Sequence, residues 1–540
     1  MSNILAIGPG RIVGTALLLS LLVVPLVFAG GDEEATATGE AAVLNETGYP
    51  IVSQPLTLHA VSSKRPFHGD WDEMLVWHEY EKKTGVHIDW DLLPWGERAT
   101  KKNVILASGD LPDFFMSVGL TLDEVIRYGG EGMFIRLNEL IDTYGSNIEA
   151  MFKQYPEVKK GITTPDGNIY HLTNVQGLYR LVPLYVNRIW VENLGLEYPE
   201  TSEDYYNVLK AFKEQDANNN GDPNDELPLA GMGSRNIRAL VRSMSGSWGL
   251  GNKGVGSWDL YGYDLGADGN VRLLAMDPAF KELLQFFNRL WQDGLIDQEI
   301  FTTDMPGFTA KGEALTVGSF AFTNTTPVGR GQMNHYRGVI FEGPNGDKMT
   351  STRTSILGGI STVVTNQSKY PKVVMRWLNW SYSDAAILLV HMGIEGDTFE
   401  ILPNGEYVYT DKIMANPELT WDQAMSRFTP YAGTSMPSVQ LLKYSKGGIS
   451  HPVVVEAMET LKPFVPEETW PAFILTQEEL ATVKPVISDA ATYIDEMVVK
   501  FITGNASFAE WDNYIDTLER MGIEKYRSAL QAAYERYQSS

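Results

Sequence analysis

The sequence contains no cysteine in 540 residues. This absence excludes disulfides, thiol nucleophiles, thiolate zinc sites and iron–sulfur clusters. Basic residues are also few, with 43 Lys and Arg against 68 Asp and Glu, which gives a formal net charge of −25. A field of that sign repels phosphate backbones and anionic lipids, so no nucleic-acid partner is expected. Neutral or cationic ligands suit the overall charge better.

Sequence motifs of common catalytic sites are missing too. The eight histidines include no His-Glu-x-x-His pair, and there is no Gly-x-Ser-x-Gly elbow and no Gly-Lys-Ser/Thr phosphate loop. Residues 249–254 match Gly-x-Gly-x-x-Gly, but a helix-like stretch precedes them, so we favour a loop over a dinucleotide site. Paired carboxylates for glycoside hydrolysis meet only in the fold, so the sequence leaves that chemistry open.

A single long hydrophobic run, residues 12–28, lies near the N-terminus between Arg11 and Ala29. It predicts a secretory signal peptide over residues 1–29, cleaved after Ala29. The alternative is an anchoring transmembrane helix, because the run is close to spanning length. Residues 30–54 begin with Gly and acidic residues and predict a disordered tether. We therefore expect a periplasmic or extracellular protein.

Hydrophobic periodicity predicts strands alternating with helices, and mainly helices at the C-terminal end. Residues 56–60 and 86–90 alternate apolar and polar side chains, and a helix at about 72–84 lies between them and ends at Gly85. This order predicts a β-α-β unit and favours α/β lobes. Another helix is expected to begin at Asp277-Pro278. Capping-box spacing predicts further helix starts at Thr201 with Asp204, Thr476 with Glu479, and Ser507 with Glu510.

The segment 216–226 is the one local motif with metal chemistry. It has oxygen-bearing side chains at positions 1, 3 and 5 and a glycine at position 6, a pattern that wraps a chain around a hard cation. Position 12 is Leu227 instead of the Glu of an EF-hand, so a neighbouring carboxylate must complete the site. We predict one structural Ca²⁺; a solvated Asn/Asp turn is the alternative. The predicted ligands are Asp216, Asn218, Asn220, Asp222 through its carbonyl, and Asp225 or Glu226.

Several short sequence strings follow one another along the chain: Lys83-Thr84-Gly85-Val86, Gly109-Asp110-Leu111-Pro112-Asp113, Thr164-Pro165-Asp166-Gly167-Asn168, Asp293-Gly294-Leu295-Ile296-Asp297, Arg376-Trp377-Leu378-Asn379-Trp380 and Gly393-Ile394-Glu395-Gly396. In this order they resemble the extracellular solute-binding proteins of ABC transporters, sugar-binding family 1. The resemblance spans about residues 55–537, and the Asp/Asn loop resembles the branch that includes LipO-like lipoproteins and alginate-binding proteins. The chain departs from that branch because it lacks the lipobox cysteine, which puts a lipid tether in doubt.

This resemblance implies an α/β, type II periplasmic binding fold, with two lobes around a ligand cleft and helices at the C-terminus. By analogy, lobe 1 takes residues 55–182 and 355–392, and lobe 2 takes residues 185–354 and 393–540. The implied function is that of a monomeric, non-enzymatic component of an ABC importer, which delivers a carbohydrate, expected to be an oligosaccharide, to the permease subunits. A secreted glycoside hydrolase or lyase, and a scaffold without a small ligand, are the alternatives.

The predicted ligand contacts come from loops beside strands and from aromatic rings. Sugars present C–H faces that stack on aromatic rings and hydroxyls that need hydrogen-bond partners. Most tryptophans lie in protein cores, but the Gly and Pro neighbours of Trp95 and the Gly and Ser neighbours of Trp248 favour loops. Whether the ligand is an oligosaccharide, a uronate or a peptide stays open. The predicted contacts are Arg65, Trp95, Asp113, Ser117, Gln176, Trp248, Phe320 and Glu395.

Overall fold

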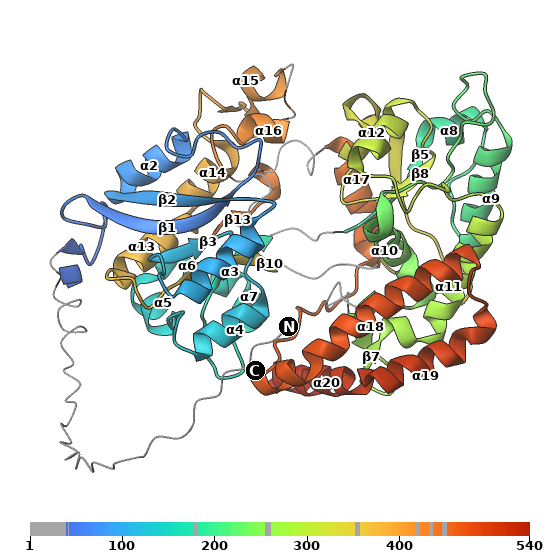
Figure 1. The fold of residues 1–540 in the computed structure, drawn as a ribbon. Helices are drawn as coiled ribbons and strands as arrows, with labels where there is room; N and C mark the ends of the chain where they lie inside the picture. Colours follow the sequence, from blue (N-terminus) through green and yellow to red (C-terminus); the bar gives the residue numbers. More distant parts are fainter. Residues whose placement is uncertain are drawn as a thin grey trace, which may run out of the picture.

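The computed structural model describes residues 39–41, 43–176, 181–253, 261–350, 357–416, 419, 421–430, 436–444 and 451–539. Two lobes lie side by side (Figure 1). The predicted signal peptide lies outside the described residues. Within the described ranges, no helix is both long and apolar enough to cross a membrane.

The first lobe is built on a six-stranded sheet with the strand order β13-β4-β10-β3-β1-β2. Strand β1 pairs in parallel with β2 and β3, and β10 runs antiparallel to β3 and β4. Because β13 pairs in parallel with β4, the carboxyl ends of β1, β2, β3, β4 and β13 lie at one edge. The strands are β1 (Leu56–Lys64), β2 (Val86–Pro94), β3 (Phe114–Met116), β4 (Leu172–Gln176), β10 (Leu357–Val364) and β13 (Val439–Gln440).

Helices cover both faces of this sheet. Alternation along β1 directs Leu58 and Ala60 into one hydrophobic cluster and Val61 into another, on the opposite face. The predicted β-α-β unit is confirmed: α2 ends at Gly85, whose φ of 77° suits a residue without a Cβ. The helices are α2 (Leu75–Thr84), α3 (Arg98–Ser108), α4 (Leu122–Gly130), α5 (Asn138–Tyr144), α6 (Ser146–Gln154), α7 (Pro156–Ile162), α13 (Pro371–Ser381) and α14 (Asp384–Met392).

Residues 399–444 pack with the first lobe, although we assigned 393–540 to the second. Phe399, Tyr409, Met425 and Val439 are buried in the hydrophobic cluster of the first lobe, and β13 completes its sheet. The physical reason is the apolar surface around β4, part of which this late segment of the chain covers. The elements are β11 (Phe399–Ile401), β12 (Tyr407–Tyr409), α15 (Asp411–Met414) and α16 (Trp421–Met425).

The expected tether over residues 30–54 is wrong for residues 43–54. Ile51 and Val52 are buried in the first lobe, and the Ile51 N–H donates to the Thr84 carbonyl (2.8 Å). Arg376 Nη2 donates to the Gly48 carbonyl (2.6 Å). This segment has enough apolar side chains to pack against the lobe. The prediction of disorder rested on the Ala- and Thr-rich stretch that precedes it.

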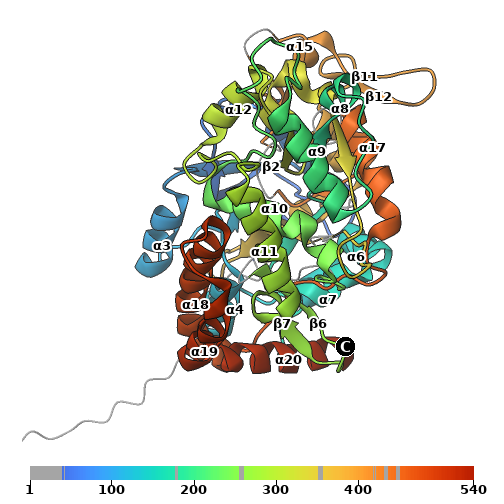
Figure 2. The same cartoon turned by 90° about the vertical axis from the view of Figure 1, so that its right-hand side faces the viewer.

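The second lobe has a three-stranded antiparallel sheet in the order β8-β5-β9, surrounded by helices. Figure 2 shows α18, α19 and α20 gathered near α11, and their apolar faces share one large cluster. The predicted helix start at Asp277 and all three capping boxes are confirmed. The strands are β5 (Leu184–Asn187), β6 (Tyr263–Leu265), β7 (Val271–Leu273), β8 (Ser319–Ala321) and β9 (Tyr336–Val339). The helices are α8 (Arg188–Asn193), α9 (Ser202–Glu214), α10 (Gly233–Ser245), α11 (Pro278–Gln292), α12 (Met305–Glu313), α17 (Pro452–Leu461), α18 (Gln477–Thr503), α19 (Trp511–Met521) and α20 (Ile523–Ser539).

Candidate ligand-binding site

Four of the predicted ligand residues lie at one edge of the first sheet. Arg65 follows β1, Trp95 follows β2, Ser117 follows β3, and Gln176 ends β4. From Gln176 the chain crosses to Leu184, where β5 of the second lobe begins, so this edge faces the second lobe. Carboxyl ends of parallel strands are where α/β folds commonly hold ligands. We call this set of strand ends the lobe-facing edge.

Trp95 lies at the lobe-facing edge between two arginines. The guanidinium carbon of Arg65 is 3.8 Å from the centre of its ring, and that of Arg98 is 3.7 Å away. The Trp95 N–H donates to the Lys64 carbonyl (2.9 Å), and Arg98 Nη1 donates to the Trp95 carbonyl (2.6 Å). Arg98 also lies against Gly119, where a Cβ would stand 3.0 Å from its Nε. Glycine at 119 therefore leaves room for this arginine.

Hydroxyl groups at the lobe-facing edge are left without partners. The buried Oγ atoms of Ser62 and Ser117 have no hydrogen-bond partner among the described residues. Ser117 has a φ of 56°, and its carbonyl accepts a hydrogen bond from Ser63 Oγ (2.6 Å). Its N–H donates to the Ser361 carbonyl of β10 (2.8 Å). Buried hydroxyls without partners are unusual in a native protein.

Asp113 lies at the opposite end of β3, away from the lobe-facing edge. One carboxylate oxygen accepts the His59 N–H (2.9 Å), and the other accepts Ser368 Oγ (2.7 Å). Both oxygens thus join β1 to the turn after β10. We leave Asp113 out of the site because its position and contacts are those of a structural residue.

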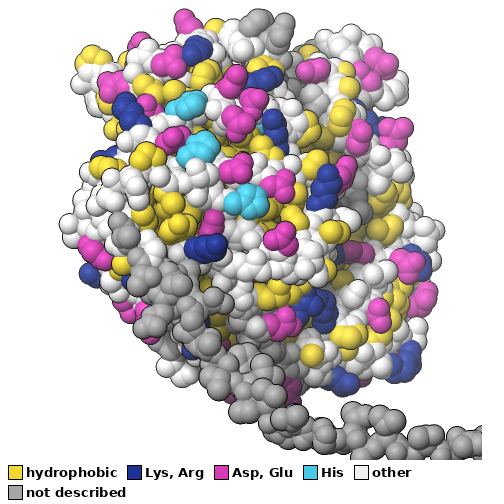
Figure 3. Space-filling model, turned by 60° about the vertical axis from the view of Figure 1, so that its left-hand side comes forward, with side chains coloured by type: hydrophobic (Ala, Val, Ile, Leu, Met, Phe, Trp, Pro, Cys, Tyr) yellow, Lys and Arg dark blue, Asp and Glu magenta, His cyan; other side chains and the backbone are white. Residues whose placement is uncertain are grey.

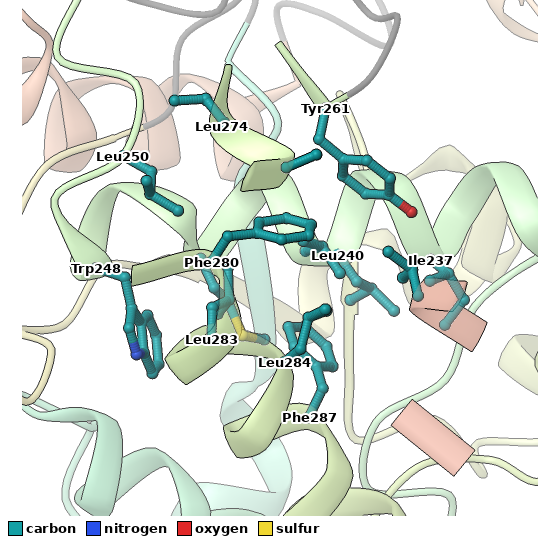
Figure 4. Packing of buried hydrophobic residues seen from close by; sticks show 14 of the residues in the cluster. Ile237, Leu240, Trp248, Leu250, Tyr261, Leu274, Phe280, Leu283, Leu284 and Phe287 are labelled. Carbon is teal, nitrogen blue, oxygen red and sulfur yellow. The ribbon is translucent and has the colours of Figure 1, made fainter. Parts of the chain in front are cut away.

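The structure places two predicted aromatic contacts in hydrophobic cores. Trp248 is 3 % exposed, and its ring centre lies 5.2 Å from that of Phe286; Figure 4 shows it among buried side chains of the second lobe. Phe320 is 1 % exposed and packs on Tyr185 and Tyr336. Buried rings of this kind do not offer a face to a sugar. A ligand role for either ring stays a prediction that its burial does not favour.

Two residues outside the predicted set of contacts also lie at strand ends near the point where the chain passes between the lobes. Phe322 is half-buried at the end of β8, beside the start of β5, and Gln440 ends β13 at the lobe-facing edge. Each of these residues is marked by its position at the end of a strand. The sequence alone does not give that position, because it depends on how the strands pair. Glu395 is exposed in a turn closed by the Gly396 N–H donating to the Phe399 carbonyl (2.8 Å).

A cavity of about 30 Å³ lies elsewhere in the first lobe, between α2, β2 and α13. None of the predicted ligand residues lines it. The face shown in Figure 3 mixes acidic and basic side chains and has no large block of one sign. The cavity is lined by Trp71, Asp72, Trp77, His78, Tyr80, Glu81, Val86, His87, Ile88, Trp90 and Trp377.

The Asp/Asn loop folds so that most of its predicted ligands converge. The Asn220 N–H donates to Asp216 Oδ1 (3.1 Å) and to Asn218 Oδ1 (2.9 Å), and the Gly221 N–H donates to Asp216 Oδ2 (2.9 Å). The side-chain amides of Asn218 and Asn220 donate to the two oxygens of Asp225 (3.0 and 2.6 Å). Gly221 has a φ of 92°, which the sharp reversal requires.

The other two predicted ligands occupy different positions. Asp222 Oδ1 accepts the Asn224 N–H (3.1 Å), so this side chain closes its own turn. Glu226 is 1 % exposed; Oε1 accepts the Ala217 N–H (2.9 Å), and Oε2 is buried without a partner among the described residues. Burial raises the pKa of this carboxyl. In the described part of the chain, no three His, Asp or Glu side chains are arranged to hold a metal, so Asn oxygens are needed here.

The described residues of the glycine-rich stretch, 249–253, contact a protein carboxylate, and Gly254 lies outside the described residues. The N–H groups of Gly251 and Asn252 donate to Asp264 Oδ2 (2.8 and 3.0 Å), and Arg272 pairs with the same carboxylate. Asp264 is fully buried. The backbone donors that a phosphate would need are therefore already used, which agrees with the loop interpretation.

Two α/β lobes, joined by crossing segments and with polar strand ends facing across, define a two-lobed solute-binding protein. Residues 67–387 match the sequence profile of the bacterial extracellular solute-binding protein family, and the chain belongs to this family. The predicted family and fold class are confirmed.

Similar proteins of known structure or function cover nearly the whole chain. The fructooligosaccharide ABC transporter substrate-binding protein FusA of Streptococcus pneumoniae is 27 % identical, over 95 % of this chain and 96 % of that protein. Its complex with kestose has a TM-score of 0.73 at 25 % identity, over 89 % of this chain and 99 % of that one. Lipoprotein LipO of Bacillus subtilis is 25 % identical over 84 % of this chain and 88 % of that protein. Alginate-binding protein AlgQ2, solved without calcium ion, shares the fold (TM-score 0.73, 23 % identity, 91 % and 100 % covered).

Proposed function

We propose that this protein is the substrate-binding component of an ABC importer and that it captures an oligosaccharide between its lobes. The observation that carries the proposal is the lobe-facing edge, where Arg65, Trp95, Ser117 and Gln176 meet at strand ends opposite the second lobe. FusA is named as a substrate-binding protein of an ABC transporter for fructooligosaccharides, which supports the same class of ligand.

Ligand capture requires the lobes to move relative to each other. We assign residues 43–182 and 355–444 to lobe 1, and 185–354 and 451–539 to lobe 2, following the two hydrophobic clusters. A hinge between the lobes allows this motion. Only a ligand that contacts both lobes shifts the population toward the closed form. The closed form of a monomer is then what the permease subunits recognise.

A thermal-shift screen of the purified chain without residues 1–29 tests this function. Neutral and acidic oligosaccharides of two to five units, monosaccharides and short peptides are added at millimolar concentration. A ligand that binds only the folded state raises the melting temperature by mass action. Oligosaccharide binding without turnover is expected. Release of shorter sugars from the bound oligosaccharide would instead identify a hydrolase.

Export and processing of the N-terminus belong to the same proposal. The family is extracellular, and we propose cleavage after Ala29 to a periplasmic or secreted product. The mass of the mature N-terminus decides this. An intact N-terminus in the membrane fraction contradicts cleavage and favours the anchor.

We also propose that the Asp/Asn loop binds one structural Ca²⁺. Asp216, Asn218, Asn220 and Asp225 already converge, and they supply only oxygen ligands once the two amides turn. The unpartnered Oε2 of Glu226 adds a buried carboxylate oxygen next to them. A FusA structure described as an EF-hand mutant indicates that such a loop exists in that relative.

Chelation tests the calcium proposal directly. EGTA is expected to lower the melting temperature by several degrees, and Asp216→Ala is expected to abolish that dependence. Asp222→Ala is the matched control, because its side chain closes a separate turn and only its carbonyl is a predicted ligand. If EGTA leaves the wild-type melting curve unchanged, the loop is a solvated turn.

A further inference from the structure

Three cationic side chains surround one corner of the lobe-facing edge. Lys64 and Arg65 come from the end of β1, and Arg98 opens α3. Two guanidinium groups within 4 Å of the Trp95 ring centre cannot share one face, so each covers a face of its own. No face of Trp95 is therefore open to a sugar ring. The corner offers N–H donors and positive charge in place of a stacking surface.

The charge of this corner opposes that of the whole molecule. The chain has a net charge of −25, yet among the described residues neither Lys64 nor Arg98 forms an ion pair. The neighbouring acid, Glu97, is exposed and pairs with Lys101 (3.2 Å). The buried Lys102 of the same helix is already neutralised by Glu124 (2.6 Å). Among the described residues, the positive charge of Lys64 and of Arg98 beside Trp95 is therefore not compensated by an acidic side chain.

Resting on the function proposed above, we propose that this corner binds a carboxylate of the ligand and that the ligand is an acidic, uronate-containing oligosaccharide. Guanidinium groups present planar pairs of donors that match the two oxygens of a carboxylate. Trp95 holds both guanidinium groups by cation–π contact, so less side-chain freedom is lost when the anion binds.

This ligand class distinguishes the chain from FusA, whose structure contains kestose, an uncharged sugar. The net charge alone suggests a neutral or cationic ligand. The proposed ligand differs because the local field at a site decides which ligand is bound. An acidic peptide carries the same carboxylate chemistry. Strand β2 is an edge strand of the sheet and ends at Pro94 beside this corner, so a peptide could extend it and is kept as a probe. The sugar is favoured because the relative FusA is named for fructooligosaccharides.

A pair of ligands that differ only in charge tests the proposal. Calorimetry compares trigalacturonate with its fully methyl-esterified form, with kestose and a tri-glutamate peptide as further probes. The acid is expected to bind at least about tenfold more tightly than the ester, because hydrogen bonds to charged groups are the stronger ones. Its affinity should fall as salt is raised from 50 to 500 mM, because ions screen the pairing.

Substitutions of single arginines test whether the acidic ligand binds at this corner. Arg98→Gln is expected to weaken trigalacturonate binding by about ten- to a hundredfold and to leave the ester unchanged, and Arg98→Lys should recover part of the loss. Arg127→Gln is the control: this exposed arginine of the same lobe also lies on an aromatic ring, 4.2 Å from that of Tyr128. Melting temperatures of all three variants check folding.

Each outcome decides between the two proposals. If kestose or the ester binds as tightly as the acid, or if Arg98→Gln leaves trigalacturonate binding unchanged, the acidic ligand class is overturned and the oligosaccharide function stands. If only the peptide binds, both the sugar class and the oligosaccharide function are overturned. If no ligand in the wider thermal-shift screen binds, the proposed function fails first.

Discussion

The loop that carries Trp95 and the turn that carries Trp248 look alike in sequence and differ in the structure. Both tryptophans have glycine next to them and small or turn-forming residues before them. Trp95 is half-buried at a strand end, between two arginines, whereas Trp248 is 3 % exposed in the largest core. A neighbouring glycine therefore predicts a turn, but it does not predict whether the tryptophan beside it is exposed. Exposure is set by distant segments, here the apolar face of α11, which packs over Trp248.

The sharpest test of this contrast is Trp248→Ala. Removing a buried indole leaves a cavity and costs the transfer free energy of the ring, so the free energy of unfolding should fall by about 3–5 kcal/mol. Ligand affinity of the fraction that folds should stay near that of the wild type. Denaturant unfolding and calorimetry measure the two quantities. A variant of normal stability that no longer binds ligand would return Trp248 to the site.

Burial also controls a titratable group in the other lobe. His171 is 4 % exposed, its Nδ1 has no partner among the described residues, and burial lowers its pKa from 6.5 to about 4. Between these values the unfolded chain binds a proton that the folded chain does not. Stability should therefore fall as pH drops from 6.5 to 4, by up to about 3 kcal/mol from this residue.

His171→Phe separates this contribution from the rest of the acid response. The variant removes the proton site and keeps an apolar ring. As pH falls from 6.5 to 4, the wild type should therefore lose stability relative to the variant. His391, whose pKa burial lowers to about 3, provides a second buried histidine on which the same measurement can be repeated. Parallel pH profiles for His171→Phe and the wild type would mean that His171 is not held neutral in the fold.

The sequence was sufficient where local chemistry decides the structure. Helix starts at Thr201, Asp277 and Thr476 depend on a side chain that caps the N–H groups a few residues on, and these were predicted correctly. The convergence of Asp216, Asn218 and Asn220 likewise depends on spacing within one turn. The β-α-β unit around Gly85 combines a local cap with a periodic pattern.

Features that depend on distant segments were missed. Nothing near Val439 indicates that it pairs with β4 more than 260 residues earlier, so the boundary of the first lobe was wrong there. The packing of Ile51 against the first lobe and the burial of Phe320 in its sheet are of the same kind. Of the two arginines that flank Trp95, Arg98 opens α3 three residues later, whereas Arg65 follows β1, and periodicity does not report that these two positions meet.

The smallest expected effect belongs to Trp95, and it completes the contrast with Trp248. In Trp95→Ala both guanidinium groups lose the ring that holds them, and each exposed cation–π contact is worth about 0.5–1 kcal/mol. Affinity for an acidic oligosaccharide should therefore fall by about 1–2 kcal/mol, or roughly five- to thirtyfold. Stability should change by less than about 1 kcal/mol, because the ring is only half-buried at a loop. Trp95→Phe keeps a smaller ring and should show an intermediate loss of affinity. Calorimetry and thermal unfolding on the same samples compare the two tryptophans directly. Trp95→Ala could instead lower stability as much as Trp248→Ala and leave binding unchanged. That result would show that Trp95 is also a core residue and that the contrast between the two tryptophans is wrong.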